Sequence, residues 1–356
     1  MQDRSWASGR SVLGFHHRIN RPTGQTGGVS SFAGNRALRG YWHAVARPDA
    51  VLAGPLAVTL LGERLVVWRA PDDRLAAAVD RCPHREAPLS AGTVVDRGLQ
   101  CPYHGWTYDA DGCCVLVPSA RPGAAVPPRA VLERVHVAER YGLVWLCLDE
   151  PVAPIPDITE DTDRSFRRIN QPVERWAAST TRLVDNFLDT AHFPFVHLGS
   201  FGGAADPEVA RMELEPLGDF YGYQYEVVAA NTMGAEASGQ TGATVERRMS
   251  TGFALPFLVR STIEYATGLR HTLLLTSAPI DDESTWFTFV VWRNDDFSVP
   301  GEEVTRLDRL IGAEDKRMLE QVPGPLPLDA TTLVNVQADR ASVEWRRRFK
   351  TLLDER

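Results

Sequence analysis

Residues 81–106 read RCPHREAPLSAGTVVDRGLQCPYHGW and contain two short motifs of metal-binding side chains. The first motif is Cys82-x-His84, and the second is Cys101-x-x-His104. Each motif places one thiol and one imidazole in the same short loop. Two cysteines and two histidines can hold a tetrahedral zinc ion, or a [2Fe–2S] cluster with the cysteines on one iron and the histidines on the other.

The order of the ligands favours the cluster over zinc. Zinc fingers usually pair cysteine with cysteine and histidine with histidine over short spacings. Here each motif mixes the two residue types, and Gly105-Trp106 follow the second histidine. This mixed order is typical of a Rieske [2Fe–2S] cluster, and structural zinc is the alternative.

A second stretch, residues 183–197, reads LVDNFLDTAHFPFVH and concentrates polar groups within an apolar run. Buried imidazoles and carboxylates are costly unless they are paired or bind a metal. Histidine is the commonest metal ligand, so the stretch indicates either a metal site or two separately hydrogen-bonded core histidines. The residues concerned are Asp185, Asn186, Asp189, His192 and His197.

The composition is that of an ordinary soluble globular protein. Of the 356 residues, 44% are hydrophobic and 24% are charged, and the net charge is −8. A negative balance argues against nucleic acid or an anionic membrane as the main partner. The apolar runs are too short to cross a bilayer. Five cysteines are too few for a disulfide framework in a chain of this length, which favours a reducing cytoplasm.

The pattern along the chain divides it into a tail and two domains. Residues 1–37 are rich in Gly, Ser and Arg and are expected to be disordered, although an organelle transit peptide would have a similar composition. Residues 38–153 are expected to form a small antiparallel β domain, which ends at the proline-rich stretch from Pro151 to Pro156. Residues 154–356 are expected to form an α+β domain.

Hydrophobic periodicity predicts the elements of both domains. Strands are expected over 56–61, 64–69, 75–80, 131–139 and 143–148, and then over 173–178, 221–229, 244–249, 258–264, 270–278 and 285–292. Helices are expected over 180–191, 302–320 and 339–353. The chain contains no dinucleotide-binding glycine motif and no P-loop.

Two adjacent acids, Glu314 and Asp315, fall at or beside the apolar stripe of the helix expected over 302–320. A carboxylate in such a position needs a partner. The partner is either a metal ion or a neighbouring cation, for which Lys316 and Arg317 are the candidates.

Several segments together resemble the Rieske non-haem iron oxygenases, in particular the α (oxygenase) subunits typified by vanillate and dicamba O-demethylases. The resemblance covers residues 38–353 and implies an N-terminal Rieske all-β domain, a helix-grip (START-like) catalytic domain and a homotrimer. Respiratory Rieske proteins differ because they carry two further cysteines, where this chain has Ala87 and Tyr103. The segments are 41–46 (YWHAVA), the cluster motifs, 141–145 (YGLVW), 185–197 and 314–320 (EDKRMLE).

The resemblance implies a role for each site residue. Cys82, His84, Cys101 and His104 would hold the [2Fe–2S] cluster, and His192, His197 and Asp315 would bind a mononuclear iron. Asp189 would bridge the two centres by accepting hydrogen bonds from His192 and from His104 of the partner subunit. Asn186 would support the iron site from outside the ligand set.

The implied activity is that of a terminal oxygenase that activates O₂ at Fe(II) with electrons from its cluster. It would hydroxylate or oxidatively demethylate an aromatic or alicyclic small molecule. The electrons would come from NAD(P)H through a separate ferredoxin/flavin reductase, for which Arg81, Arg85 and Arg97 are candidate docking residues. The alternatives are a cis-dihydroxylating ring oxygenase and, in a different class, a non-catalytic electron carrier or START-like binding protein.

The sequence also suggests residues for the substrate pocket. The strands that follow residue 197 are expected to line it with apolar side chains. Aromatic residues at strand spacing are as often part of the core. The candidates are Phe195, Phe201, Asn231, Phe253, Leu255, Phe257, Trp286 and Trp292.

Overall fold

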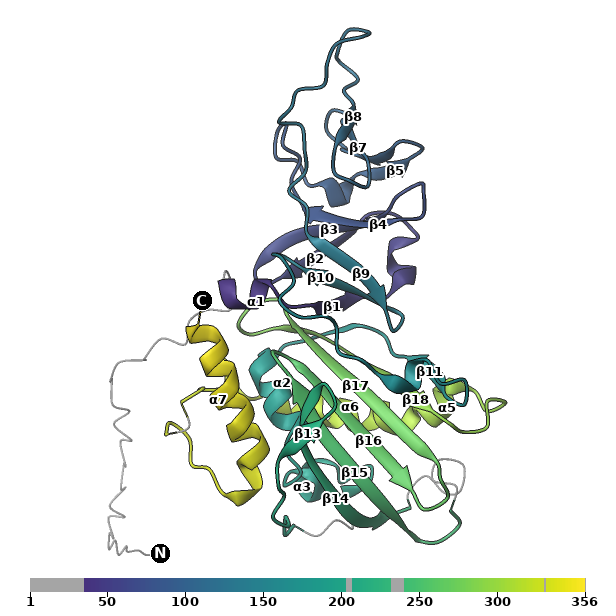
Figure 1. Cartoon of the computed structure of the whole chain (residues 1–356), viewed down its shortest axis with the longest axis vertical. Helices are drawn as coiled ribbons and strands as arrows, with labels where there is room; N and C mark the ends of the chain where they lie inside the picture. The colour runs from purple at the N-terminus through teal and green to yellow at the C-terminus, as the bar shows by residue number, and fades with distance from the viewer. Residues whose placement is uncertain (1–34, 203–206, 232–239, 330, 356) are drawn as a thin grey trace, which may run out of the picture.

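The computed structural model describes residues 35–202, 207–231, 240–329 and 331–355, and most of the predicted tail lies outside these ranges. The folded part begins earlier than predicted, because helix α1 (Arg36–Arg39) already buries Ala37 and Leu38. The two domains lie one above the other along the long axis of the molecule, as Figure 1 shows. In the described part of the chain no helix is long and apolar enough to cross a membrane.

The N-terminal domain is built from three small antiparallel sheets, as predicted for a Rieske domain. The strands are short because Gly, Pro and Asp turns interrupt them every few residues. One expected strand, 131–139, is regular only from His136, and Val131 forms an isolated bridge with Cys113. The sheets are β1 (His43–Ala46), β10 (Leu143–Cys147) and β9 (His136–Arg140); β2 (Leu56–Leu60), β3 (Glu63–Arg69) and β4 (Leu75–Val79); and β5 (Thr93–Val95), β6 (Gly98–Gln100), β7 (Thr107–Tyr108) and β8 (Cys114–Leu116).

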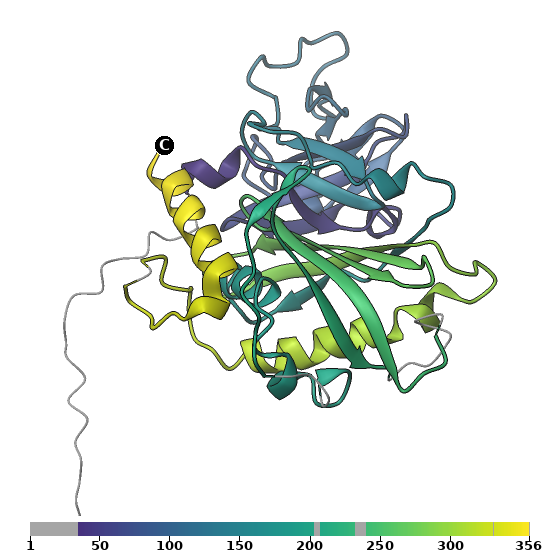
Figure 2. The ribbon, with the colours of Figure 1, turned by 60° about the horizontal axis from the view of Figure 1, so that its bottom comes forward.

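The C-terminal domain is one antiparallel sheet of eight strands packed against helices, which is the expected helix-grip arrangement. Figure 2 shows the curved sheet with helix α6 (Arg306–Leu319) running along one face. The strands are β11 (Arg167–Asn170), β12 (Glu174–Trp176), β13 (Glu215–Leu217), β14 (Phe220–Ala230), β15 (Thr244–Ala254), β16 (Leu258–Tyr265), β17 (Arg270–Pro279) and β18 (Thr285–Arg293). The other helices are α2 (Thr180–Phe187), α3 (Phe193–Val196), α5 (Gly301–Val304) and α7 (Arg340–Asp354).

Two predicted helices are shorter than the sequence pattern suggests. The helix from Thr180 ends at Phe187 because the Asp189 carboxylate accepts hydrogen bonds from the backbone N–H groups of Ala191 and His192, at 3.0 Å each. Such a side chain competes with the helical backbone and starts a new turn. The helix expected over 302–320 is broken at Thr305, whose hydroxyl donates to the carbonyl of Gly301 at 2.8 Å.

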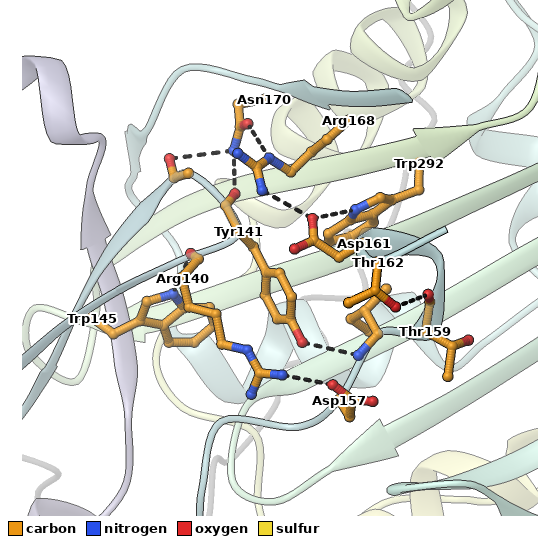
Figure 3. A network of polar contacts seen from close by, with 12 residues as sticks. Arg140, Tyr141, Trp145, Asp157, Thr159, Asp161, Thr162, Arg168, Asn170 and Trp292 are labelled. Carbon is orange, nitrogen blue, oxygen red and sulfur yellow. Dashed lines mark hydrogen bonds and ion pairs between the residues drawn. The ribbon is translucent and has the colours of Figure 1, made fainter. Parts of the chain in front are cut away.

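A polar network fixes the junction between the domains (Figure 3). The Tyr141 hydroxyl donates to the carbonyl of Pro156 and accepts from the N–H of Ile158, both at 2.9 Å. The amide of Asn170 donates to the Tyr141 carbonyl at 2.7 Å, and it packs so closely that a Cβ on Gly142 would lie 2.6 Å from Asn170 Oδ1. The predicted exit segment of the first domain is therefore tied directly to the second.

The hydrophobic core is also shared across the junction. One cluster of buried side chains includes Leu60 and Leu146 in the sheets of the first domain together with Val184, Phe257 and Trp345 in the second. The Trp345 indole donates to the carbonyl of Pro256 at 3.0 Å, which anchors helix α7 to the sheet. Because burial of such side chains is worth about 1.5–3 kcal/mol each, the shared core and the polar network hold the two domains in one orientation.

Candidate metal centres

The four predicted cluster residues meet at the tip of the N-terminal domain. Cys82 and Cys101 are buried and close enough to share a hydrogen bond, and His84 and His104 pack edge to face with ring centroids 4.5 Å apart. The thiols thus face the protein and the imidazoles face outward. This paired arrangement fits a [2Fe–2S] cluster with two cysteines on the inner iron and two histidines on the outer iron.

Neighbouring rings support this tip. The Trp106 indole stacks on His84 with a centroid distance of 4.4 Å, which explains the tryptophan after the second motif. The Tyr108 hydroxyl lies 3.2 Å from the Sγ atom of Cys82. Burial raises the pKa of the Tyr108 phenol above its usual value, so it stays protonated and can donate to the sulfur. The sequence contained no sign of this second contact.

The second centre forms between α2, α3 and α6. His192, His197 and Asp315 bring one possible ligand atom each to a common point, and these atoms lie within 4.8 Å of one another. The Nε2 atoms of the two histidines are 3.1 Å apart, and Asp315 Oδ1 lies 3.6 Å from the first and 3.4 Å from the second. The three predicted ligands therefore converge, although the histidines and the carboxylate come from distant parts of the chain.

Each imidazole contacts a carboxylate through Nδ1, on the side of the ring opposite Nε2. Asp189 Oδ2 lies 2.7 Å from Nδ1 of His192, and Glu314 Oε2 lies 3.0 Å from Nδ1 of His197. A carboxylate accepts a hydrogen bond from the ring nitrogen it faces, so each ring carries its hydrogen on Nδ1 and leaves a lone pair on Nε2. Two lone pairs and the Asp315 carboxylate then converge, and Asn186 is a donor that contacts this carboxylate. Such a set favours a cation, and two histidines with one carboxylate suit iron(II).

The pKa values of the groups at the centre are shifted mainly by burial. Burial lowers the pKa of His197 and raises the pKa of Asp315, because the charged form of each is poorly solvated there. Burial would also raise the pKa of Asp189, but its hydrogen bond with His192 and the charge of that ring bring the pKa below its usual value. Asn186 donates to Asp315 Oδ1 at 3.0 Å, so the predicted supporting residue holds the carboxylate in place.

Glu314 is the functional residue of this centre that sequence reasoning missed. The cations suggested as its partners do not pair with it, and Lys316 instead contacts Glu174 at 3.1 Å. Glu314 is 5% exposed and accepts from the Gly199 N–H at 2.9 Å and the Ser200 hydroxyl at 2.7 Å. Its position directly before a predicted ligand, on a buried helix face, was the only available sign.

A cavity opens next to the second centre, between the sheet and α6. Of the eight predicted pocket residues only Phe201 lines it. Phe195 is 68% exposed, and Phe253 and Phe257 belong to the core. Trp286 and Trp292 lie on the opposite face of β18, where Trp286 donates to the carbonyl of Thr59. The apolar lining comes instead from Phe187, Phe193, Met249, Ile263, Leu273, Leu275, Phe287, Phe289 and Ile311.

Comparison with known proteins matches both halves of the chain. Residues 41–136 match the Rieske [2Fe–2S] domain, and residues 176–355 match the vanillate O-demethylase oxygenase C-terminal domain.

The chain is a Rieske non-haem iron oxygenase.

Known oxygenases are also similar to this chain over most of its length. The chain is 34% identical to methylxanthine N1-demethylase NdmA of Pseudomonas putida, over 86% of this chain and 84% of that protein. It is 29% identical to a vanillate O-demethylase oxygenase subunit of a Pseudomonas species, over 86% and 92%. The structure of NdmA with caffeine superposes with a TM-score of 0.78 at 31% identity, covering 89% of this chain and 92% of that one.

Membership confirms the predicted class of enzyme. The oxygenase is an oxidoreductase of the group that hydroxylates or demethylates small organic molecules, and the alternatives, a dihydroxylase and a non-catalytic carrier, do not fit these relatives. The family uses a Rieske cluster and a mononuclear iron centre, and separate proteins deliver its electrons.

Proposed function

We propose that this oxygenase oxidatively demethylates a heteroaromatic or aromatic small molecule. His192, His197 and Asp315 would hold the mononuclear iron, and Cys82, His84, Cys101 and His104 the cluster. The observation that carries the proposal is the convergence of one possible ligand atom each from His192, His197 and Asp315 beside a largely apolar cavity. Several relatives are named as demethylases of methylxanthines, vanillate or dicamba.

Iron(II) held by these residues would supply the activation of O₂. The protein's own contribution is positioning. Asp189 and Glu314 fix the two imidazoles, Asn186 fixes the carboxylate, and the apolar cavity wall excludes water from the reacting methyl group. In the overall reaction the methyl carbon leaves as formaldehyde, one oxygen atom of O₂ enters it and the other leaves as water, and NAD(P)H supplies two electrons through the reductase.

The two centres of one chain lie far apart, which supports assembly with other copies. Strands β5 and β7, which directly follow the two cluster loops in the chain, lie in the upper part of Figure 1, whereas α3 and α6 lie in its lower half. Electron transfer therefore needs a cluster from another chain. We propose the homotrimer expected from the family, with Asp189 facing His104 of the partner subunit. The exposed His104 and the partly exposed Asp189 carboxylate leave both groups accessible for such a contact.

The reductase would dock where the cluster histidines reach the surface. Arg85 and Arg97 are exposed beside the two cluster loops. Arg81 is also exposed, but Glu86 and Glu133 lie 3.6 and 3.7 Å from its guanidinium and compensate its charge. Arg85 and Arg97 are thus the better candidates for an acidic reductase surface. The cytoplasmic location expected from the cysteine content stays a prediction.

The test is a formaldehyde screen with a matched iron-site variant. The purified oxygenase, loaded with iron and coupled to a reductase and NAD(P)H, is offered methoxy- and N-methyl-substituted aromatics. We expect formaldehyde and about three iron atoms per chain. His192→Ala should keep the cluster absorption, lose one iron and release no formaldehyde. Hydroxylated products without formaldehyde across the whole panel would contradict demethylation.

A further inference from the structure

The end of the cavity remote from the metal-binding residues is polar, and strand register creates it. Successive residues of a strand face opposite sides of the sheet. The residues that face the cavity become polar at one end of strands β15 to β18. Arg247 pairs with Tyr265 between β15 and β16, and His271 pairs with Arg293 between β17 and β18. All four line the cavity. The phenol of Tyr265 hydrogen-bonds to Arg247 and lies close enough to Arg293 and Asp308 to feel their charges.

Asp308 reaches this polar end from helix α6. It lies seven residues before Asp315, so two helical turns, or about 10 Å, separate their backbones along one face. Ile311 and Gly312 lie between them on the same face and also line the cavity. One helix face therefore runs from the metal-binding carboxylate to a second carboxylate. A spacing of about 10 Å is longer than a single six-membered ring.

The charges at this end are arranged in an ordered chain. Arg293 contacts Asp295 at 2.9 Å, and Asp295 is also bound by Arg167 at 2.7 Å. Arg293 Nη1 lies 3.0 Å from Nδ1 of His271, and because an arginine nitrogen can only donate, His271 accepts there and carries its hydrogen on Nε2. That Nε2 lies 3.3 Å from Asp308 Oδ1.

Three groups remain for a ligand. Asp308 Oδ2, Arg247 Nε and His271 Nε2 are shielded from solvent and have no hydrogen-bond partner among the described residues. A buried carboxylate oxygen without a donor is unfavourable. A ligand N–H would satisfy Asp308, and a ligand carbonyl would satisfy the guanidinium of Arg247. An anionic ligand would instead bring its charge against the Asp308 carboxylate.

The geometry points to a neutral bicyclic heterocycle as the substrate class, recognised through a ring N–H donated to Asp308 and a neighbouring carbonyl that accepts from Arg247. Its methyl group would lie at the opposite end, beside the iron ligands. The inference rests on the proposed function, because it takes this cavity to be the substrate site. It adds that Asp308 and Arg247 determine specificity, whereas the apolar wall only selects for size.

Binding measurements on the intact, metal-loaded oxygenase test this without turnover. Theobromine and caffeine are a matched pair of probes, since caffeine differs by one methyl group that replaces the ring N–H between two carbonyls. Titration calorimetry without oxygen or reductase should find theobromine bound about 10- to 100-fold more tightly, as for a hydrogen bond to a charged group. Asp308→Leu should abolish the preference, and Asp308→Asn, which keeps an acceptor, should retain part of it.

The control is Glu302→Gln, which removes an exposed carboxylate near the start of α6 and should leave the preference intact. Cluster absorption and the thermal unfolding midpoint show whether each variant is folded. Equal affinity for the two probes, binding of neither probe, or a preference that survives in folded Asp308→Leu would overturn the inference. Because no step of the measurement releases formaldehyde, a failure here is distinct from failure of the proposed demethylation.

Discussion

Glu314 accepts a hydrogen bond from Nδ1 of His197 across 3.0 Å, while the next residue in the helix, Asp315, faces the Nε2 side of the same ring. Adjacent residues on α6 thus contact opposite edges of one imidazole. The arrangement separates the carboxylate that orients the ring from the carboxylate that would bind the metal. It also makes the site testable residue by residue.

Glu314→Gln should weaken iron binding at the mononuclear site about 10- to 100-fold, because the ring of His197 loses the charged partner that fixes its hydrogen on Nδ1. Fe(II) titration of the metal-depleted protein measures the change. Absorption of the cluster should stay the same. The matched control is Glu303→Gln, an exposed carboxylate in α5. An unchanged iron affinity in Glu314→Gln would refute the orienting role.

Gly199→Ala should perturb the same contact by steric means. A Cβ on Gly199 would lie 2.7 Å from Glu314 Oε1, so the carboxylate must shift. We expect weaker iron binding than in the parent protein and a lower unfolding midpoint, as measured by Fe(II) titration and calorimetry. Gly312→Ala is the control, because its Cβ would meet no heavy atom within 4 Å and alanine stabilises a helix by about 0.5–1 kcal/mol relative to glycine. Equal iron affinity in both variants would refute the close contact.

Tyr108→Phe should lower the reduction potential of the cluster. The Tyr108 hydroxyl donates toward Cys82 Sγ, and a hydrogen bond to a ligand sulfur favours the reduced, more negative state. A loss of about 1 kcal/mol corresponds to about 40 mV for one electron. Spectroelectrochemical titration measures the shift. Tyr103→Phe removes an exposed hydroxyl from the loop between Cys101 and His104 and should leave the potential unchanged. Identical potentials in the two variants would exclude the sulfur contact.

Asp189→Asn should block electron transfer from the cluster to the mononuclear iron. The amide keeps an oxygen acceptor for the backbone of the following turn, so both centres should remain loaded, but the charged bridge is lost. In a single-turnover experiment with substrate and O₂, the chemically reduced cluster should stay reduced. Asp296→Asn, on an exposed turn, serves as the control. Normal cluster oxidation in Asp189→Asn would end the bridge proposal.

The sequence predicted the two centres better than it predicted what surrounds them. Ligand spacing within short loops is a local property, so Cys82, His84, Cys101 and His104 could be recognised directly. Asp315 is selected by the resemblance to the family, since the apolar helix face alone does not separate it from Glu314. The partner of Glu314 could not be found in this way, since it depends on the rotation of α6 against α3.

The prediction of the residues that line the cavity failed for a related reason. Alternation along β18 separates Trp286 and Trp292 from Phe287 and Phe289, but both sets are aromatic. Only the packing of the sheet against the first domain decides which face is left for the cavity. The tryptophans face away from the cavity, and Trp286 donates to Thr59 of that domain. Long-range packing of this kind leaves no periodic signature in the chain.

Helix α6 carries Asp308 at one end of the cavity and Asp315 at the other, with no break between them. A continuous helix keeps the spacing of these two carboxylates constant, because both are fixed to the same hydrogen-bonded backbone. A ligand that contacts Asp308 is therefore held at a set distance from the residues that would bind the metal.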